Sequence, residues 1–223
     1  MSHRSRNSQP SLPRRSVIAG GLTLAAGAGL LGPALAAELV ATPHQTAGPF
    51  YPQIKPLDSN SDLVRVEGRS EPAAGEVVHV FGQVMDQSGR VLPGLLVELW
   101  QCDAFGRYHH PRERGGGADP NFQGYGQMVA GNDGTFRFRT IEPVPYTGRT
   151  PHIHFAVTDP GGGRLTTQMY LRGHPLNERD FIFRNIGDPK AREIVQVTLE
   201  AAPEIEGGTR AGRFDIILGK IAS

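Results

Sequence analysis

Two histidines separated by one residue, His152 and His154, lie in the stretch TPHIHFAV, which otherwise has the apolar content of a buried β-strand. Side chains of a strand alternate between its two faces, so both imidazoles point to one side while Ile153, Phe155 and Val157 point to the other. The imidazoles then lie about 6–7 Å apart along the strand, close enough to bind one metal ion. Because His-x-His also occurs on ordinary surface strands, the pair alone does not establish a metal site.

Two tyrosines precede the histidine pair, Tyr146 six residues before His152 and Tyr108 in the stretch WQCDAFGRYHHP. Taken singly, Tyr108 is typical of a loop aromatic and Tyr146 of a packing residue that follows a proline. Their occurrence ahead of the histidine pair strengthens the case for a metal site.

The elements that must position these side chains are predicted to be strands. The chain has 29 Gly and 18 Pro in 223 residues, with short apolar runs between turn-forming residues, which favours strands over long helices. We therefore expect an all-β fold, an antiparallel β-sandwich or flattened barrel. Strands are expected at residues 76–86, 92–103, 125–130, 135–141, 152–158, 164–171, 194–200 and 212–218, and one short helix at 189–196.

The segments between these strands are expected to be turns and long connections. The dipeptide Asp133-Gly134 predicts a β-hairpin, with Phe136 and Phe138 pointing into the core. Residues 103–124 form a polar loop of a length that is uncommon in compact domains unless the loop is functional. Residues 37–75 show neither a helical nor a strand period and predict an irregular arm that precedes a catalytic domain over 76–223.

The N-terminal segment predicts export. The pair Arg14-Arg15 precedes the run SVIAGGLTLAAGAGLLGPALA, which ends in an A-x-A cleavage pattern. This is typical of a twin-arginine signal over residues 1–36, so the mature protein is expected in the periplasm or outside the cell. The alternative is a membrane anchor over 17–35, which the glycines and modest hydropathy of that run disfavour. We expect no membrane partner for the mature form.

Charge and cysteine content argue against a nucleic-acid-binding protein and against a fold held by disulfides. Residues 1–36 carry four arginines and no acidic residue, so their removal changes the formal charge from +1 to −3. The weak basicity belongs to the signal, and no nucleic-acid partner is expected. Since an exported chain with a single cysteine, Cys102, cannot close an intramolecular disulfide, the fold must rest on its apolar core. Cys102 itself is expected to be a small buried residue.

Five stretches carry a resemblance that runs through residues 42–219. They are LVELWQCDAFGRYHHP, DPNFQGYG, DGTFRFRTIEPVPYTGRTPHIHF, LTTQMYLRGHP and RFDIILG. In them the chain resembles the non-haem iron(III) intradiol ring-cleavage dioxygenases, most closely the protocatechuate 3,4-dioxygenase group. By position, the resemblance implies that Tyr108, Tyr146, His152 and His154 are the iron ligands. Two phenolates and two neutral imidazoles form a hard anionic set that favours Fe(III) over Fe(II). A free phenol has a pKa of about 10, so the metal must stabilise the phenolates, and its binding must release protons. It includes no carboxylate ligand, which leaves Glu142 outside the set.

The resemblance also implies a reaction and two further site residues. A catechol would bind the ferric ion through both oxygens and displace Tyr146, and O2 would open the ring between the hydroxyl-bearing carbons, giving a muconate-type diacid. Arg149 would stand as a cation beside the developing negative charge, and Gln168 would hydrogen-bond near the substrate or O2. In the plainer interpretations Arg149 forms a surface salt bridge and Gln168 faces water. Expected partners are a small aromatic diol and O2.

The sequence leaves the substrate and the oligomeric state open. Only five residues separate Tyr146 from His152, where the better-known relatives carry a longer insertion, so this wall of the pocket must differ. The chain has no room for the helical dimerisation domain of catechol 1,2-dioxygenases, and whether it forms a homo-oligomer is open. His109 and His110 are expected to be loop or supporting residues beside Tyr108. No partner is evident for His44, His79 and His174.

Two other functions fit parts of the sequence. The stretch FGQVMDQSGRVLPGLLVELW also resembles the opening strands of exported immunoglobulin-like or transthyretin-like modules, which bind or space other domains without catalysis. Alternatively, His152 and His154 could hold Fe(II) or Zn(II) in another enzyme, with both tyrosines as bystanders.

Overall fold

The computed structural model describes residues 38–56, 58–114 and 116–219. The predicted signal over 1–36, with Arg14-Arg15, lies outside the described residues. Within the described part of the chain, no helix is both long and apolar enough to span a membrane.

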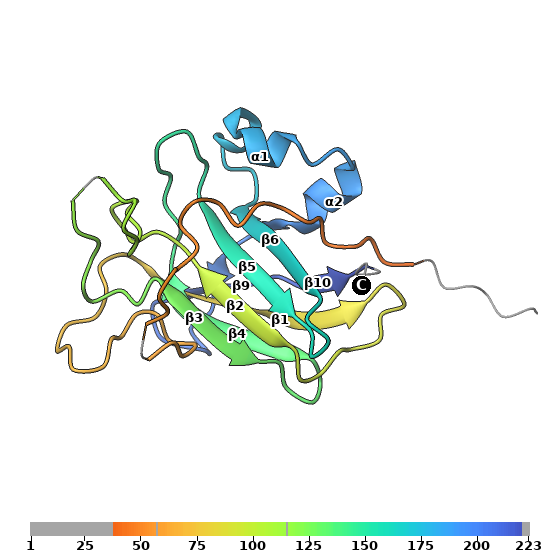
Figure 1. Ribbon diagram of the computed structural model, residues 1–223, viewed down its shortest axis with the longest axis horizontal. Helices are drawn as coiled ribbons and strands as arrows, with labels where there is room; N and C mark the ends of the chain where they lie inside the picture. The colour runs from red at the N-terminus through yellow and green to blue at the C-terminus, as the bar shows by residue number, and fades with distance from the viewer. Residues whose placement is uncertain (1–37, 57, 115, 220–223) are drawn as a thin grey trace, which may run out of the picture. The chain divides into compact units, whose positions relative to one another are not determined.

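The described chain folds into short strands with three short helical segments near the C-terminal end (Figure 1). The strands are β1 (Val77–Asp86), β2 (Leu96–Trp100), β3 (Tyr125–Val129), β4 (Thr135–Ile141), β5 (His152–Thr158), β6 (Arg164–Leu171), β7 (Gln196–Val197), β8 (Glu200–Ala201), β9 (Arg210–Arg213) and β10 (Ile216–Leu218). The helical segments are the 3-10 turn η1 (Asn177–Arg179) and the helices α1 (Phe181–Arg184) and α2 (Pro189–Ile194).

The strands form two sheets that pack on one apolar core. One sheet has the order β10-β1-β9-β8, with β4 paired to β1, and the other has the order β3-β2-β5-β6-β7. Rings from both sheets meet between them: Phe155 of β5 lies 5.9 Å from Phe136, 6.2 Å from Phe138 and 5.1 Å from Phe214, measured between ring centroids. The predicted all-β sandwich is confirmed, and Cys102 is a buried free thiol.

The strands are not all antiparallel, which corrects the expected sheet type. β1 pairs in parallel with β9 and with β10, and β6 pairs in parallel with β7. A parallel pair needs a long connection that returns the chain to the same end of the sheet. The segment with η1, α1 and α2 provides that connection between β6 and β7.

The predicted hairpin at Asp133-Gly134 is wrong, because β3 pairs with β2 and β4 pairs with β1. The turn is present, with Gly134 at a φ of 72°, but it links the two sheets. Local turn chemistry does not determine which strands pair, since the register of β3 and β4 depends on their distant partners.

The C-terminal third departs from expectation at its element boundaries. The strand expected at 194–200 is replaced by the end of α2 and the two-residue strands β7 and β8, and the strand expected at 212–218 is divided into β9 and β10. The expected helix at 189–196 corresponds to α2, whereas η1 and α1 were not predicted. Elements of three or four residues are too short to show a helical period.

Residues 44–56 of the N-terminal arm lie on the outer face of the second sheet, whereas Leu63 and Val64 pack into the sandwich core. The described residues of the arm, 38–56 and 58–75, contain no helix or strand beyond an isolated bridge between Asp62 and Arg139. The arm crosses in front of β5 and β6 in Figure 1, where the amide of Gln45 donates to the carbonyl of Thr166 at 2.7 Å. The second sheet is therefore covered on both faces, by the sandwich core on one face and by the arm on the other.

A buried carboxylate attaches the arm to the sheet. Glu98 of β2 has no exposed surface, yet it accepts hydrogen bonds from Lys55 (2.9 Å), Tyr51 (2.8 Å) and Tyr125 (2.7 Å) and pairs with Arg164. Burial by itself would raise the pKa of Glu98, but these donors outweigh it and lower the pKa to about 2. Lys55 and Tyr51 belong to the arm, so the Glu98 cluster fixes the arm to the sheet.

Protonation or neutralisation of Glu98 is expected to loosen this attachment. Because the pKa of Glu98 is lower in the folded chain than its usual value of 4.5, the carboxylate stabilises the fold above that pH, and the stabilisation is lost as the pH falls towards 2. We expect Glu98→Gln to lower the free energy of unfolding by about 1–3 kcal/mol at pH 7. Urea unfolding at several pH values measures both effects, and an unchanged acid dependence in Glu98→Gln would contradict the assignment.

Candidate metal centre

The register of three strands places polar and aromatic side chains in rows on the outer face of the second sheet. Trp100 of β2 lies opposite His154 of β5, which lies opposite Gln168 of β6, and His152 lies opposite Tyr170. The alternation of β5 is as predicted, since its other side chains, with Ile153 among them, belong to the sandwich core. The two imidazoles therefore share the face that the arm covers.

Two connections bring the tyrosines to the same place. Asp103 shapes the loop before Tyr108, because its carboxylate accepts from the amides of Phe105 and Arg107 at 2.9 Å. Tyr146 begins a tight turn in which the amide of Arg149 donates to the carbonyl of Tyr146 at 2.8 Å. Gly148, third in this turn, has a φ of 76°, a conformation that favours glycine.

The rings of Tyr108, Tyr146, His152 and His154 form a closed cluster. Going around it, ring centroids are 5.6 Å apart for Tyr108 and Tyr146, 5.4 Å for Tyr146 and His152, 4.8 Å for the two histidines and 6.5 Å for His154 and Tyr108. Side chains from a loop, a turn and one strand thus surround one small space. The structure brings together all four residues that the sequence resemblance selected.

The polar atoms in this cluster lack partners, although they are buried. The hydroxyl of Tyr108, Nε2 of His152 and Nδ1 of His154 have no hydrogen-bond partner among the described residues. Buried polar atoms are nearly always satisfied in folded proteins, and three orphans in one cluster indicate a missing ligand. Oxygen and imidazole nitrogen donors with free lone pairs fit a hard metal ion such as Fe(III).

The histidines are held in the neutral form that a metal requires. Nδ1 of His152 lies 2.7 Å from the carbonyl of Thr150, so it carries the proton and leaves the lone pair of Nε2 free. Burial, aided by the positive charge of Arg149, lowers the pKa of His152 to about 3. Burial likewise holds the pKa of His154 well below its usual range, with His152 and Arg149 adding to the effect.

The two tyrosines differ in their surroundings. Tyr108 is almost fully buried, and burial raises the pKa of its phenol well above the usual value. Tyr146 is partly exposed, and its pKa is also raised by burial, although the nearby charge of Arg149 opposes that rise. Both phenols are therefore protonated until a cation binds, and Tyr146 has more freedom to move than Tyr108.

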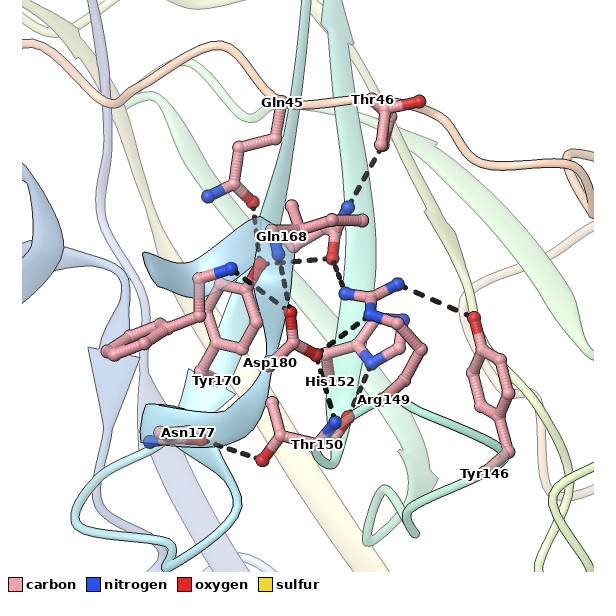
Figure 2. Close-up of polar contacts among 12 residues, drawn as sticks. Gln45, Thr46, Tyr146, Arg149, Thr150, His152, Gln168, Tyr170, Asn177 and Asp180 are labelled. Atoms are coloured by element: carbon pink, nitrogen blue, oxygen red, sulfur yellow. Dashed lines mark hydrogen bonds and ion pairs between the residues drawn. The ribbon is translucent and has the colours of Figure 1, made fainter. Parts of the chain in front are cut away.

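Arg149 lies at the centre of a hydrogen-bond network beside the cluster (Figure 2). Its Nε donates to Asp180 at 2.8 Å, its Nη2 donates to Oε1 of Gln168 at 2.5 Å, and its Nη1 lies 3.5 Å from the hydroxyl of Tyr146. Its side chain is 14% exposed. The plainer interpretation of Arg149 as a surface salt bridge is wrong, because its ion pair with Asp180 is internal.

The sequence did not lead us to predict Asp180 as the partner of Arg149. It caps α1 by accepting from the amides of Ile182 and Phe183, and its other oxygen accepts from the amide of Thr150 and from Arg149. Burial alone would raise the pKa of Asp180, but these donors lower it. A signal was present, since an aspartate just before an apolar run is typical of a helix N-cap.

The arm forms a roof over the cluster. The ring of Phe50 stacks on that of Tyr108, with centroids 4.7 Å apart and planes inclined by 15°, and Gly48 lies against the ring of His154. Gln168 has no exposed surface, and its amide nitrogen donates to the carbonyl of Thr46 at 3.0 Å, so the interpretation that it faces water is wrong. No sequence pattern in the arm indicated these contacts.

Trp100 completes the packing around the histidines. Its ring stacks on that of His154, with centroids 4.9 Å apart and planes within 6°. Trp100 follows Glu98 by two residues along β2, so both side chains lie on the same face of the strand, outside the sandwich core. The charge of Glu98 within an apolar strand was the available signal that this face of β2 carries polar contacts and does not belong to the sandwich core.

The other histidines of the described part of the chain lie outside the cluster. His109 is exposed, with Nε2 2.9 Å from the carbonyl of Asp119, and His110 is buried edge-on to Phe50. His44 is exposed. The other two have partners that the sequence did not show: Nε2 of His79 lies 3.0 Å from Glu206, and Nδ1 of His174 lies 3.3 Å from the hydroxyl of Thr150.

Comparison with known proteins agrees with this arrangement. A family model described as "Dioxygenase" matches residues 46–219, which include the roof, the cluster and Arg149. The chain belongs to the intradiol dioxygenase family. Members of this family use non-haem iron(III). Because the family consists of dioxygenases, this intradiol dioxygenase is an oxidoreductase.

The names of the relatives of this intradiol dioxygenase refer to different diols. The protocatechuate 3,4-dioxygenase beta chain of Burkholderia cepacia is 38% identical over 175 residues, which is 73% of this chain and 72% of the relative. The hydroxyquinol 1,2-dioxygenase of Nocardioides simplex is 30% identical over 200 residues, 80% of this chain and 64% of the relative. The chain therefore spans less than two thirds of the hydroxyquinol enzyme.

Solved structures show the same fold. The dioxygenase domain of a dioxygenase carbohydrate-binding protein fusion from Streptomyces sp. SirexAA-E matches with a TM-score of 0.61 and 32% identity, over 81% of this chain and 99% of that chain. The sandwich described above therefore has the same fold as that dioxygenase domain, whose structure was solved apart from the rest of its fusion protein.

Removal of the negative charge of Asp180 is expected to destabilise the site. Asp180→Asn leaves Arg149 in a buried environment without its counter-charge, so we expect the free energy of unfolding to fall by about 1–3 kcal/mol. Asp188→Asn is the matched control, because Asp188 caps α2 in an exposed position without an arginine partner. Urea unfolding at pH 7 compares the two, and equal losses would contradict the special role of the Asp180–Arg149 pair.

Proposed function

We propose that this intradiol dioxygenase opens the ring of a catecholic substrate with O2 between its two hydroxyl-bearing carbons, giving a muconate-type diacid. The site would hold a non-haem Fe(III) ion through Tyr108, Tyr146, His152 and His154. The observation that carries the proposal is the closed cluster of these four rings with three unsatisfied buried polar atoms. The substrates named for the relatives, protocatechuate and hydroxyquinol, are consistent with a diol.

The side chains divide the work of binding. When bound, the ferric ion would supply a Lewis acid that favours the deprotonated diol. His152 and His154 contribute neutral donors whose orientation is set by the carbonyl of Thr150 and the ring of Trp100. Tyr108, packed under Phe50, would remain in place during turnover.

Tyr146 and Arg149 suit the step that admits the substrate. Tyr146 is the more exposed of the two tyrosines, so as a metal-held phenolate it would be the one to leave its position and take up a proton from the diol at its phenolate oxygen, becoming a neutral phenol. Arg149 Nη1, 3.5 Å from that oxygen, stabilises negative charge on either the tyrosine or the substrate. Gln168 and Asp180 hold the guanidinium in this direction.

The two alternative functions have less support. In the described residues, no group of three or more His, Cys, Asp or Glu is arranged to hold a metal, so the tyrosines are the candidates for further protein ligands to an ion at His152 and His154. A purely structural module would have no need of three unsatisfied polar atoms in one buried cluster.

We also propose export through the signal over 1–36, for which the sequence is the support.

Colour tests the ligand set. Iron bound to phenolates should give a visible charge-transfer band, so we expect the iron-loaded protein to be red-brown and Tyr108→Phe and Tyr146→Phe each to change that band. Tyr125→Phe is the control, because this buried phenol is bonded to Glu98 and Gln127 and lies outside the cluster. Visible absorption together with the iron content of each variant checks this, and an unchanged band in both tyrosine variants would overturn the ligand set.

Oxygen uptake tests the reaction. With catechol, 3,4-dihydroxybenzoate and hydroxyquinol we expect one O2 consumed per ring and a diacid product that keeps both oxygen atoms. Arg149→Gln should lower kcat by about 100-fold, because it removes a charge that acts on the reacting atoms. An oxygen electrode and mass spectrometry of the product in 18O2 measure both quantities. Cleavage beside the diol, or no uptake with any diol, would refute the proposed function.

A further inference from the structure

A cavity of about 420 Å³ lies against the turn that carries Tyr146 and Arg149. Pro145 and Leu176 contribute apolar surface to its walls, and Arg179, the last residue of η1, is also among its lining residues. Its volume is within the range of about 300–1,000 Å³ that is typical of small-molecule sites. The cavity shares Tyr146 with the candidate metal centre, since that ring lies 5.4 Å from His152.

The charges that line this cavity do not cancel. Asp180 is the one carboxylate among the lining residues, and it is already engaged by the amides of Thr150, Ile182 and Phe183 and by Arg149. Among the lining residues, the charges of Arg149 and Asp180 therefore offset each other, while Nη1 of Arg149 still faces Tyr146. Arg179 is exposed, and its side chain forms no ion pair or hydrogen bond within the described part of the chain. The neighbouring Glu178 does not line the cavity.

We propose that Arg179 is a specificity residue that binds an anionic substituent, a carboxylate, on the catechol ring. This inference rests on the proposed function, because the diol edge of the ring must face Tyr146. A substituent on the opposite edge then points into the cavity that Pro145, Leu176 and Arg179 also line, so the free guanidinium is the cation available to it there. Arginine suits this task, since its planar fork matches a carboxylate with two hydrogen bonds.

Substrate preference tests the assignment in the iron-loaded full-length protein. We expect Arg179→Gln to lower the ratio of kcat/KM for 3,4-dihydroxybenzoate to that for catechol by about five- to tenfold, the effect of one partly exposed ion pair. Arg179→Lys should keep most of the preference. Arg184→Gln is the matched control, because Arg184 is exposed on α1 nearby and does not line the cavity. It should leave the ratio unchanged.

Binding without turnover gives a second readout. Calorimetry with 4-hydroxybenzoate and phenol, which lack the second hydroxyl, should show a preference for 4-hydroxybenzoate that weakens in Arg179→Gln and at high salt, while phenol binding stays constant. Equal effects on both ligands, or the same loss in Arg184→Gln, would overturn the role of Arg179. If catechol is cleaved and the ratio is unchanged by Arg179→Gln, the present inference fails alone. If no diol is cleaved, the proposed function fails, and calorimetry still decides whether Arg179 binds a carboxylate.

Discussion

The alternation of β5 is the constraint on which the site depends. One face of this strand supplies Ile153, Phe155 and Val157 to the core, and that burial fixes the register of His152 and His154 on the other face. A slip of one residue would place both imidazoles in the apolar core, which the cost of burying unpaired polar groups forbids. The same apolar packing that stabilises the sandwich therefore also aligns the two nitrogen donors.

A second requirement is that a polar face be buried without leaving charges unpaired. Glu98 and Asp180 have fully buried side chains, and each is surrounded by donors from more than one part of the chain. Loss of one partner from such a cluster is costly, because the remaining charge stays buried. Tyr108, His152 and His154 differ from these carboxylates, since each has a buried polar atom without a hydrogen-bond partner within the described residues.

The sequence allowed the sandwich, the alternation of β5 and the grouping of the four rings to be predicted, because each depends on a local pattern or on motifs in a specific order. Pairing between distant strands was not predictable: the turn at Asp133-Gly134 resembles that of a hairpin, and nothing local shows that it joins two sheets. The contacts of Asp180 and Phe50 were missed for the same reason. Both residues reach the site from segments whose position is set by tertiary packing rather than by their own residue pattern.

The way in which the arm closes over the site has a consequence for the order of folding. The contacts from Thr46 to Gln168 and from Gln45 to Tyr170 join residues separated by 122 and 125 positions along the chain. Contacts of such long range carry a high loop-closure cost and form late, after the strands that they join. We expect residues 44–50 of the arm to open as a local unit while both sheets stay intact, because none of them belongs to the sandwich core. The four donors would then be reachable from solvent in an otherwise native molecule, which gives a metal ion a route of entry that does not require global unfolding.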